Sequence, residues 1–209
     1  MIELYTWSTP NGRKVSIGLE EMGLPYELHP VDLTKSEASK PEFALISPNG
    51  RIPAIVDRET GVRMMESGAI LMYLAEKSGK FWPPSGKARW ETVEWLIWQM
   101  AGFGPQLGQI HHFVRFNPGK SAYAEERFLN EGKRLYGVLD RRLGEAEFVA
   151  GDYSIADMAI FPWAARFEWQ TIDLNAYPNV LRWYRAIAAR PAVQKGYDVP
   201  ATGAVIPMP

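Results

Sequence analysis

Cysteine is absent from this chain of 209 residues. Without a thiol the chain can form no disulfide, no thiolate metal site and no cysteine nucleophile of its own. Only three histidines are present, too few to indicate a metal cluster, so we expect no metal. Any thiol chemistry at this chain must therefore use a sulfur that a ligand brings.

An excess of charge of either sign is also missing. Lysine and arginine number 23 against 24 aspartates and glutamates, a formal net charge of −1, and no concentrated basic stretch indicates a nucleic-acid partner. No apolar run approaches the roughly 18 residues of a membrane span, and the first five residues lack the basic and apolar regions of a signal peptide. With 46% hydrophobic residues, we expect a globular protein with a real core, cytoplasmic and without a membrane partner.

The most informative stretch begins near residue 52. Ile52–Asp57 favours a strand, a turn containing Gly61 follows, and Val62–Met65 favours the returning strand of a hairpin. A helix is then expected to open at Ser67 and to end before Gly79.

This hairpin and helix together resemble a ligand site. A cis bond before Pro53 would turn the backbone N–H and C=O of Ile52 outward, where an extended peptide can pair with them. Glu66 is placed to hold an ammonium group, and the helix start at Ser67 suits an anion. A small peptide with one amine and two carboxylates would fit. Taken singly, Pro53 is an ordinary edge proline and Glu66-Ser67 an ordinary helix cap.

The rest of the first half predicts an α/β arrangement. Residues 2–7 favour a strand, a helix ends at Gly23, residues 26–33 favour a second strand, and residues 42–46 a short helix. The order is β-α-β, a short helix, then β-β-α. The crossover helix implies a parallel strand pair, to which the hairpin adds antiparallel strands.

Composition changes after residue 80, where Pro and Gly predict a linker over residues 80–86. Long helical patterns then dominate residues 87–200, and residues 201–209 predict a flexible tail. Ser154 and Asp157 form a capping box. Two helix stripes are expected, the first formed by Trp90, Val93, Ile97 and Met100 and the second by Phe128, Leu135, Leu139 and Leu143.

Over nearly its whole length the chain resembles the cytosolic glutathione transferases. The resemblance lies in the β-α-β opening, in Ser47–Ile55, in Glu66–Ile70 with Tyr73-Leu74, and in Ser154–Asp157. The loop Thr9-Pro10-Asn11-Gly12, with Gln109 and His111-His112-Phe113 further on, is similar to the bacterial Nu class, whose members act as glutathione-dependent disulfide reductases.

The resemblance implies a thioredoxin-like α/β N-terminal domain over residues 1–79, an all-α helical C-terminal domain, and a homodimer. It implies that Ile52, beside cis-Pro53, pairs with the cysteinyl backbone of glutathione, the expected co-substrate. It further implies that Glu66 holds the γ-glutamyl amine and that Ser67 holds the adjoining carboxylate.

The same resemblance places Thr9 and Asn11 beside the glutathione sulfur as the catalytic pair. Hydroxyl and amide donors there would favour the thiolate, since donors to the charged form lower a thiol pKa. The alternative is a helix-start turn in which Asn11 is only a cap. Ser8 competes for the sulfur contact, and Tyr5 does so more weakly because its ring fits the core.

Two further glutathione contacts are implied. Arg127 matches an arginine that reaches the ligand from the neighbouring subunit; without the resemblance it would be an ordinary surface charge. The family often has a glutamine in the loop after the second strand, and Ala38 occupies that place here. Lys40 or Lys35 is expected to take over the contact.

For the second substrate, an organic disulfide or an electrophile, the sequence offers His111, Phe113 and Trp169, with Trp163 as a further aromatic wall. Adjacent His111 and His112 must project in different directions. Each aromatic residue has an equally simple interpretation as part of the core.

Three functions remain open at this point. In the first, bound glutathione supplies the thiol that reduces an organic disulfide. In the second, glutathione is conjugated to an apolar electrophile. In the third, the fold is kept as a non-enzymatic regulatory or binding module. The absence of a clear catalytic Tyr or Cys in the first loop favours the first, and the intact Ile52-Pro53 and Glu66-Ser67 argue against the third.

Overall fold

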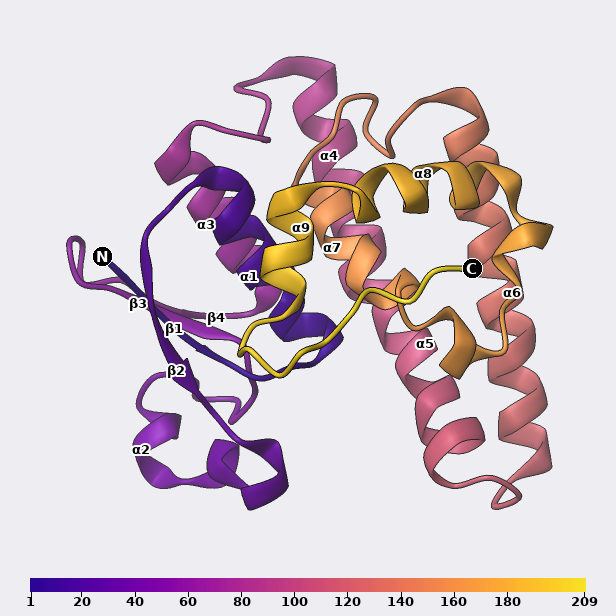
Figure 1. Ribbon diagram of the computed structural model, residues 1–209, viewed down its shortest axis with the longest axis horizontal. Coiled ribbons are helices and arrows are strands. Elements are labelled where there is room, and N and C mark those ends of the chain that lie inside the picture. Colours follow the sequence, from indigo (N-terminus) through magenta and orange to yellow (C-terminus); the bar gives the residue numbers. More distant parts are fainter. The chain divides into compact units, whose positions relative to one another are not determined.

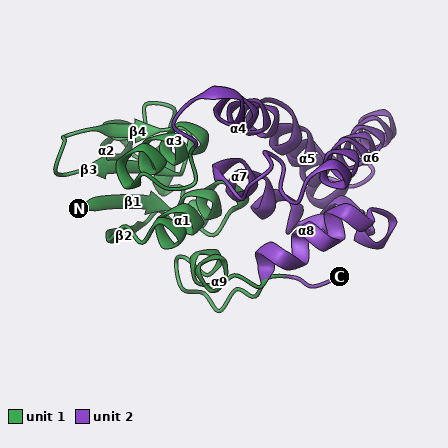
Figure 2. Cartoon of the chain, turned by 90° about the horizontal axis from the view of Figure 1, so that it is seen from above, with its two compact units in different colours: residues 1–82, 189–206 green, residues 83–188, 207–209 purple.

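The computed structural model describes residues 1–209 and divides into two compact units, drawn in different colours in Figure 2. Unit 1 comprises residues 1–82 and 189–206, and unit 2 comprises residues 83–188 and 207–209. No helix in either unit combines the length and hydropathy needed to cross a lipid bilayer.

Unit 1 is built on a four-stranded sheet in the order β2-β1-β3-β4 (Figure 1). β1 is parallel to β2, while β3 is antiparallel to both β1 and β4, so the predicted β-α-β and β-β-α halves are confirmed. Its elements are β1 (Ile2–Thr6), α1 (Pro10–Met22), β2 (Tyr26–Pro30), η1 (Leu33–Lys35), η2 (Glu37–Ser39), α2 (Pro41–Ala44), β3 (Ala54–Asp57), β4 (Arg63–Met65), α3 (Ser67–Ser78) and α9 (Pro191–Tyr197).

The second strand ends earlier than residue 33, where the sequence placed its end. β2 stops at Pro30, and the Val31 N–H makes the last hydrogen bond to β1, on the Thr6 carbonyl at 2.9 Å. Asp32 then caps a short 3₁₀ turn, its Oδ1 accepting the Thr34 N–H at 2.9 Å. The local turn chemistry of Asp32 therefore wins over the strand preference of the residues beside it.

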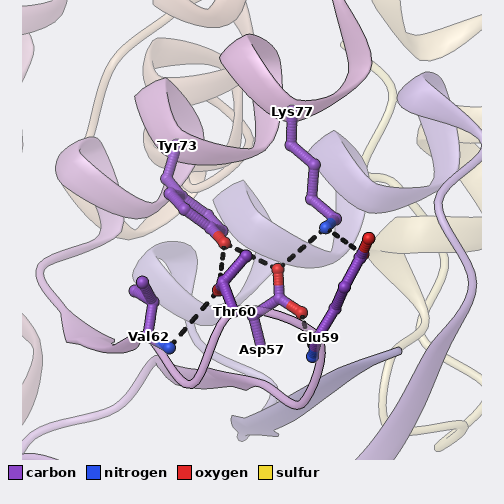
Figure 3. A network of polar contacts seen from close by, with 6 residues as sticks. All are labelled: Asp57, Glu59, Thr60, Val62, Tyr73 and Lys77. Carbon is purple, nitrogen blue, oxygen red and sulfur yellow. Dashed lines mark hydrogen bonds and ion pairs between the residues drawn. The ribbon is translucent and has the colours of Figure 1, made fainter.

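The hairpin is fixed to α3 by a polar network shown in Figure 3. Buried Asp57 accepts from the Tyr73 hydroxyl at 2.6 Å and pairs with Lys77 Nζ at 3.0 Å. The Glu59 N–H donates to the same carboxylate at 3.0 Å. Burial alone would raise the pKa of Asp57, but these three donors hold it well below its usual range. The network thereby fixes the hairpin tip, and with it the register of the strands that lead to Ile52 and Glu66.

Helix α9 packs on α1 at very short range. A Cβ on Gly196 would lie 2.6 Å from the Ile17 Cα, so only glycine allows this approach. The Ser16 hydroxyl donates to the Gly196 carbonyl at 2.6 Å, and Arg13 Nε donates to the Tyr197 carbonyl at 2.9 Å. The Arg13 guanidinium also lies 3.7 Å from the centre of the Tyr197 ring.

These contacts explain why the structural division differs from the boundaries drawn on the sequence. Residues 189–206 group with the sheet and α1 rather than with the helical unit. A helical pattern shows that a segment is helical, but not which neighbour it packs on. At the C-terminus, Ile206 is buried and the Pro207 carbonyl accepts a hydrogen bond from Tyr184 at 2.6 Å. Within the segment predicted as a flexible tail, these two residues are therefore held, whereas Val205 and Met208 are exposed.

Unit 2 is helical throughout (Figure 1). Its elements are α4 (Gly86–Trp98), η3 (Gln99–Phe103), α5 (Gly104–Ile110), η4 (His111–Phe116), α6 (Ala122–Glu145), α7 (Ile155–Ala164), η5 (Phe167–Gln170), η6 (Leu174–Ala176) and α8 (Pro178–Ala188). η3 and η4 are π-helical. This geometry is rare in proteins, and where it occurs it often lies at a functional site. The capping box of Ser154 and Asp157 is present.

The two predicted apolar stripes differ in their exposure to solvent. On α6 the stripe is core, with Leu135, Leu139 and Leu143 buried. On α4 the predicted stripe is an outward face, where Trp90 is 70% exposed and Ile97 is 53% exposed. Thus α4 carries an exposed apolar face that the unit does not cover.

Candidate functional site

The segments predicted to hold glutathione meet at one edge of the unit 1 sheet. Tyr5 pairs with Ala54, and Ala54 pairs with Met65, so these three residues form one row across β1, β3 and β4. Because β3 runs opposite to its neighbours, its start lies beside the ends of β1 and β4. Thr9, Ile52-Pro53 and Glu66-Ser67 therefore all lie beyond the same edge.

Thr9 begins helix α1 as its N-cap. Its Oγ1 accepts the Gly12 N–H at 3.1 Å, and its own hydroxyl proton is given to no group of the chain. A hydroxyl with its acceptor role filled and its proton unused is a donor for a nearby anion. Thr9 thus has the geometry of a hydrogen-bond donor to a thiolate.

The loop that carries Thr9 and Asn11 is tightly folded. A Cβ on Gly12 would lie 2.2 Å from the Trp7 carbonyl oxygen and 2.5 Å from the Thr6 hydroxyl. Asn11 follows Pro10 in the first turn of α1. The close approach at Gly12 fixes the backbone from which both predicted catalytic side chains project.

The two competitors for the sulfur contact are occupied elsewhere. The Ser8 hydroxyl accepts from the Arg13 guanidinium at 2.9 Å. Tyr5 donates to Glu3 at 2.9 Å and stacks on His29; burial and the Glu3 carboxylate raise the pKa of Tyr5 to about 12. A phenol held in this way is a poor thiol activator, and its ring packs against the core cluster as predicted.

Ile52 offers a free backbone edge. The Ile52-Pro53 bond is cis, as the sequence suggested. Neither the N–H nor the C=O of Ile52 makes a hydrogen bond within the chain, although the ladder begins two residues later at Ala54. A half-buried, unpaired strand end of this kind can pair with an extended peptide.

Glu66 and Ser67 form the other end of the candidate site. Glu66 has a backbone φ of +70°, an uncommon conformation for glutamate. Its carboxylate is exposed, caps no helix N–H and forms no ion pair. Ser67 is 3% exposed at the first position of α3. Together they place an exposed carboxylate beside a helix start, the arrangement predicted for a ligand amine and a ligand carboxylate.

A charge that the sequence did not single out lies beneath this site. Lys14 on α1 is 1% exposed. Burial lowers the pKa of Lys14 to about 7, and the negative charge of Glu66 opposes that shift. The candidate site therefore has a buried lysine on its protein side, close enough to Glu66 to interact with it.

Replacing Lys14 by methionine is expected to remove the pH dependence of stability that this buried ammonium group gives the protein. Between about pH 7 and the ordinary lysine value of 10.5 the unfolded chain binds more protons than the folded chain, so wild-type stability rises with pH there. From about pH 7 to about pH 9 the melting temperature of the wild type should therefore rise relative to that of Lys14→Met. Scanning calorimetry across this window checks it; a pH-independent gap would contradict it.

The predicted contacts on the loop after β2 are partly engaged. Lys40 is exposed and lies 3.6 Å from Glu37, while Lys35 lies 3.3 Å from Asp32. Ala38 packs against the cluster of Val31, Phe43 and Ala54. Both lysines are surface charges that could turn to a ligand, since exposed ion pairs of this kind are weak.

In unit 2, His111 and Trp169 come together. The His111 ring stacks on Trp163 at 5.5 Å and meets the Trp169 ring edge-on at 5.4 Å. Gln170 Nε2 lies 3.4 Å from His111 Nε2. His112 is exposed whereas His111 is buried, as their adjacency implied. Burial and the charges of Arg166 and Arg115 lower the pKa of His111 to about 4, so its ring stays neutral.

Phe113 and Arg127 lie apart from that cluster. Phe113 stacks on Phe128 of α6 at 5.6 Å and makes no ring contact with His111 or Trp169. Arg127 lines a separate cavity of about 610 Å³ between α5 and α6, together with Tyr123 and Glu131 among others. Of the residues predicted for the second substrate, His111 and Trp169 therefore lie together, whereas Phe113 lies against α6.

Three residues near these sites escaped sequence reasoning. Lys14 lies in a helix that is buried on almost every side, so no amphipathic pattern separates it from a surface lysine. Arg115 and Arg166 are 51 positions apart by their numbers and meet only in the folded unit. No local signal in the sequence would have revealed them.

Comparison with known families agrees with this geometry. Residues 9–77 match the model of the glutathione S-transferase N-terminal domain, and residues 122–186 match that of the C-terminal domain. The chain is 48% identical to disulfide-bond oxidoreductase YfcG of Escherichia coli over 198 residues, 92% of each chain. It is 40% identical to YghU, a second disulfide-bond oxidoreductase of that organism, over 96% of this chain and 75% of the relative.

Solved structures of glutathione transferases resemble this chain in both fold and sequence. A glutathione transferase from Burkholderia graminis, with two glutathione molecules bound per subunit, has a TM-score of 0.91 and 42% identity over 97% of this chain and 89% of its own. One from Pseudomonas putida, with one glutathione disulfide per subunit, has a TM-score of 0.91 and 42% identity over 96% and 92%. The chain therefore belongs to the glutathione S-transferase family.

Proposed function

We propose that this protein catalyses the glutathione-dependent reduction of organic disulfides. The observation that carries the proposal is the sheet edge of unit 1. There a chain without cysteine presents an unpaired Ile52 backbone, an unpaired Glu66 carboxylate and an unused Thr9 hydroxyl proton. Relatives named disulfide-bond oxidoreductases, and neighbours with bound glutathione or glutathione disulfide, support it.

The chemistry balances without any thiol of the protein. The thiolate of one glutathione attacks a sulfur of the disulfide, forming a mixed disulfide and releasing a thiolate that takes up a proton. A second glutathione thiolate then attacks the glutathione sulfur of the mixed disulfide. Glutathione disulfide forms and the second thiol leaves. Two glutathiones supply the two electrons.

The residues have separate tasks in this proposal. Ile52, beside Pro53, pairs with the cysteinyl backbone, Glu66 holds the γ-glutamyl amine, and Ser67 holds its carboxylate. Thr9 and Asn11 donate to the sulfur and favour its thiolate, because hydrogen bonds to a charged form lower the pKa. Lys40 is proposed as a further, exposed contact for glutathione.

A homodimer belongs to the proposal. The exposed apolar face of α4 that includes Trp90 and Ile97 is the kind of surface that a second subunit covers. Arg127 would contact the ligand of the partner subunit. A cytoplasmic location is proposed because the reaction consumes reduced glutathione, which reducing compartments maintain.

Activity with two substrates tests the reaction class. We expect purified protein to reduce hydroxyethyl disulfide with glutathione at least about tenfold faster than it conjugates a chlorinated nitrobenzene, because the site activates a thiolate but shows no group that would assist the aromatic substitution. Both rates are measured after subtraction of the uncatalysed reaction. Equal rates, or faster conjugation, would favour the general transferase reaction instead.

Replacing Asn11 by alanine separates catalysis from binding. We expect kcat for disulfide reduction to fall about tenfold or more, the value of one hydrogen bond to a charged group, while the Kd for glutathione changes by less than about threefold. Asn49→Ala, at an exposed turn of the same unit, is the matched control. A collapse of binding with kcat preserved would assign Asn11 to glutathione binding and not to catalysis.

A further inference from the structure

The buried lysine of α1 has no task in the function proposed above. Lys14 is 1% exposed, and its helix begins at the same edge of the unit 1 sheet as α3 (Figure 1). The strands that precede the two helices, β1 and β4, run in the same direction, because each is antiparallel to β3. Helices α1 and α3 therefore also run in the same direction from that edge.

The contact between these helices sets which of their residues face each other. A Cβ on Gly18 of α1 would lie 2.6 Å from Leu71 Cδ2 of α3, so the two helices touch there. Four residues earlier on each helix, about one turn back, Lys14 stands opposite Ser67. The packing thus places a buried lysine behind the helix start that is proposed to hold the γ-glutamyl carboxylate.

The surroundings of Lys14 favour a negative charge. The start of α3 carries a positive partial charge, and a buried ammonium group beside it adds a second positive charge where little water can screen it. Burial lowers the pKa of Lys14 to about 7, and the charge of Glu66 opposes that shift. A carboxylate bound at the start of α3 would therefore stabilise the ammonium form of Lys14.

Burial does not cut Lys14 off from a ligand. The Glu66 carboxylate is exposed, yet its charge acts on Lys14. A ligand carboxylate beside Ser67, the next residue of the chain, would act on Lys14 in the same way, through the protein and without direct contact.

Further charged groups on the elements packed against α1 pair with one another. On the α9 side the pairs are Lys195–Glu20 and Arg190–Glu21, and on α3 the pair is Lys77–Asp57. The neighbouring Arg13 donates to the Tyr197 carbonyl at 2.9 Å. Glu66 is the charged group that faces Lys14 from α3.

We propose that Lys14 is the buried counter-charge for the α-carboxylate of the γ-glutamyl group, and that it makes the enzyme selective for thiols whose γ-glutamyl group carries this carboxylate. The inference rests on the proposed function and deepens it. Lys14 is a positioning residue here: it acts on the ligand through its charge, behind Ser67, and takes no part in the exchange of sulfur.

Two ligands that differ in this carboxylate test the inference. S-methylglutathione carries it, whereas 4-aminobutyryl-S-methylcysteinylglycine keeps the amine and lacks it, and neither has a thiol. In calorimetric titrations at about pH 6, where Lys14 is charged, Lys14→Met should raise the Kd for S-methylglutathione at least about fivefold and change that for the analogue by less than about twofold. Lys195→Met, which removes a lysine of the same unit whose side chain is 72% exposed, should change neither Kd.

A measurement on the wild-type protein makes the test independent of how Lys14→Met folds. The ¹³C chemical shift of lysine Cε follows the protonation of its amine, so labelled protein should show a lysine signal with a midpoint near pH 7. S-methylglutathione should raise that midpoint by roughly 0.7 unit, the fivefold change in Kd seen from the side of the proton, because coupling between two binding events is reciprocal. The analogue should not raise it.

Two results would overturn the inference and leave disulfide reduction intact. Equal losses of affinity for both ligands in Lys14→Met would assign Lys14 a structural role. A midpoint that S-methylglutathione does not move would show that the carboxylate and Lys14 are not coupled. If neither glutathione nor S-methylglutathione bound the wild-type protein, the proposed function would fail as well.

Discussion

Replacing Glu66 by glutamine is expected to weaken glutathione binding roughly 30-fold, about 2 kcal/mol, the usual value of a hydrogen bond between charged groups. The exposed Glu66 carboxylate makes no hydrogen bond or ion pair within the chain, although the charge of buried Lys14 acts on it. The ligand amine is therefore its proposed bonding partner. The loss should appear in the KM for glutathione and in the Kd from calorimetric titration, with kcat at saturation nearly kept.

Stability gives this experiment its control. Because Glu66 caps no helix N–H, Glu66→Gln loses only the attraction between its charge and buried Lys14, and it should lower the melting temperature by less than about 3 °C. Glu42→Gln, at another exposed carboxylate of unit 1, should change neither binding nor stability. Unchanged glutathione affinity in Glu66→Gln would remove Glu66 from the site.

The second large effect is expected in unit 2, at Asp157. This fully buried carboxylate accepts the Trp183 indole N–H at 2.8 Å and the backbone N–H groups of Val149 at 3.1 Å and Ser154 at 3.0 Å. Burial raises the pKa of Asp157 to about 6, and these donors oppose the shift. Asp157→Ala leaves three buried donors without an acceptor and should cost roughly 4 kcal/mol.

For a chain of this length that loss corresponds to a melting temperature lower by roughly 10 °C, measurable by calorimetry or circular dichroism. Asp152→Ala, at an exposed position nearby, should shift it by less than about 2 °C. A small effect at Asp157 would show that its capping box is dispensable.

The geometry of the candidate site could be predicted because its signals are local. Gly61 and Gly79 mark a turn and a helix end, and the structure has positive φ at both. The spacing of Ile52-Pro53 and Glu66-Ser67 around one hairpin is itself a distance constraint, since antiparallel strands of fixed register bring their outer ends together. Sequence spacing was therefore enough to predict most of the strands and helices of unit 1.

What escaped prediction depends on packing between distant segments. Gly196 looks like any helix-end glycine until α1 is placed against it. Trp90 and Ile97 follow a helical period that does not tell a core face from an outward one. Arg115 and Arg166 both lie against Trp169 only because the fold brings η4 and η5 together. The period of apolar residues predicts whether a segment is a helix or a strand. Which segments pack against it depends on the whole fold.

We propose that the protein, which has no cysteine, activates the thiol of bound glutathione. The most direct test is to titrate the thiolate absorbance of protein-bound glutathione against pH. We predict a midpoint at least about one unit below the ordinary thiol value of roughly 8.5, and a return toward that value in Asn11→Ala. A bound thiol that titrates like free glutathione would contradict the account.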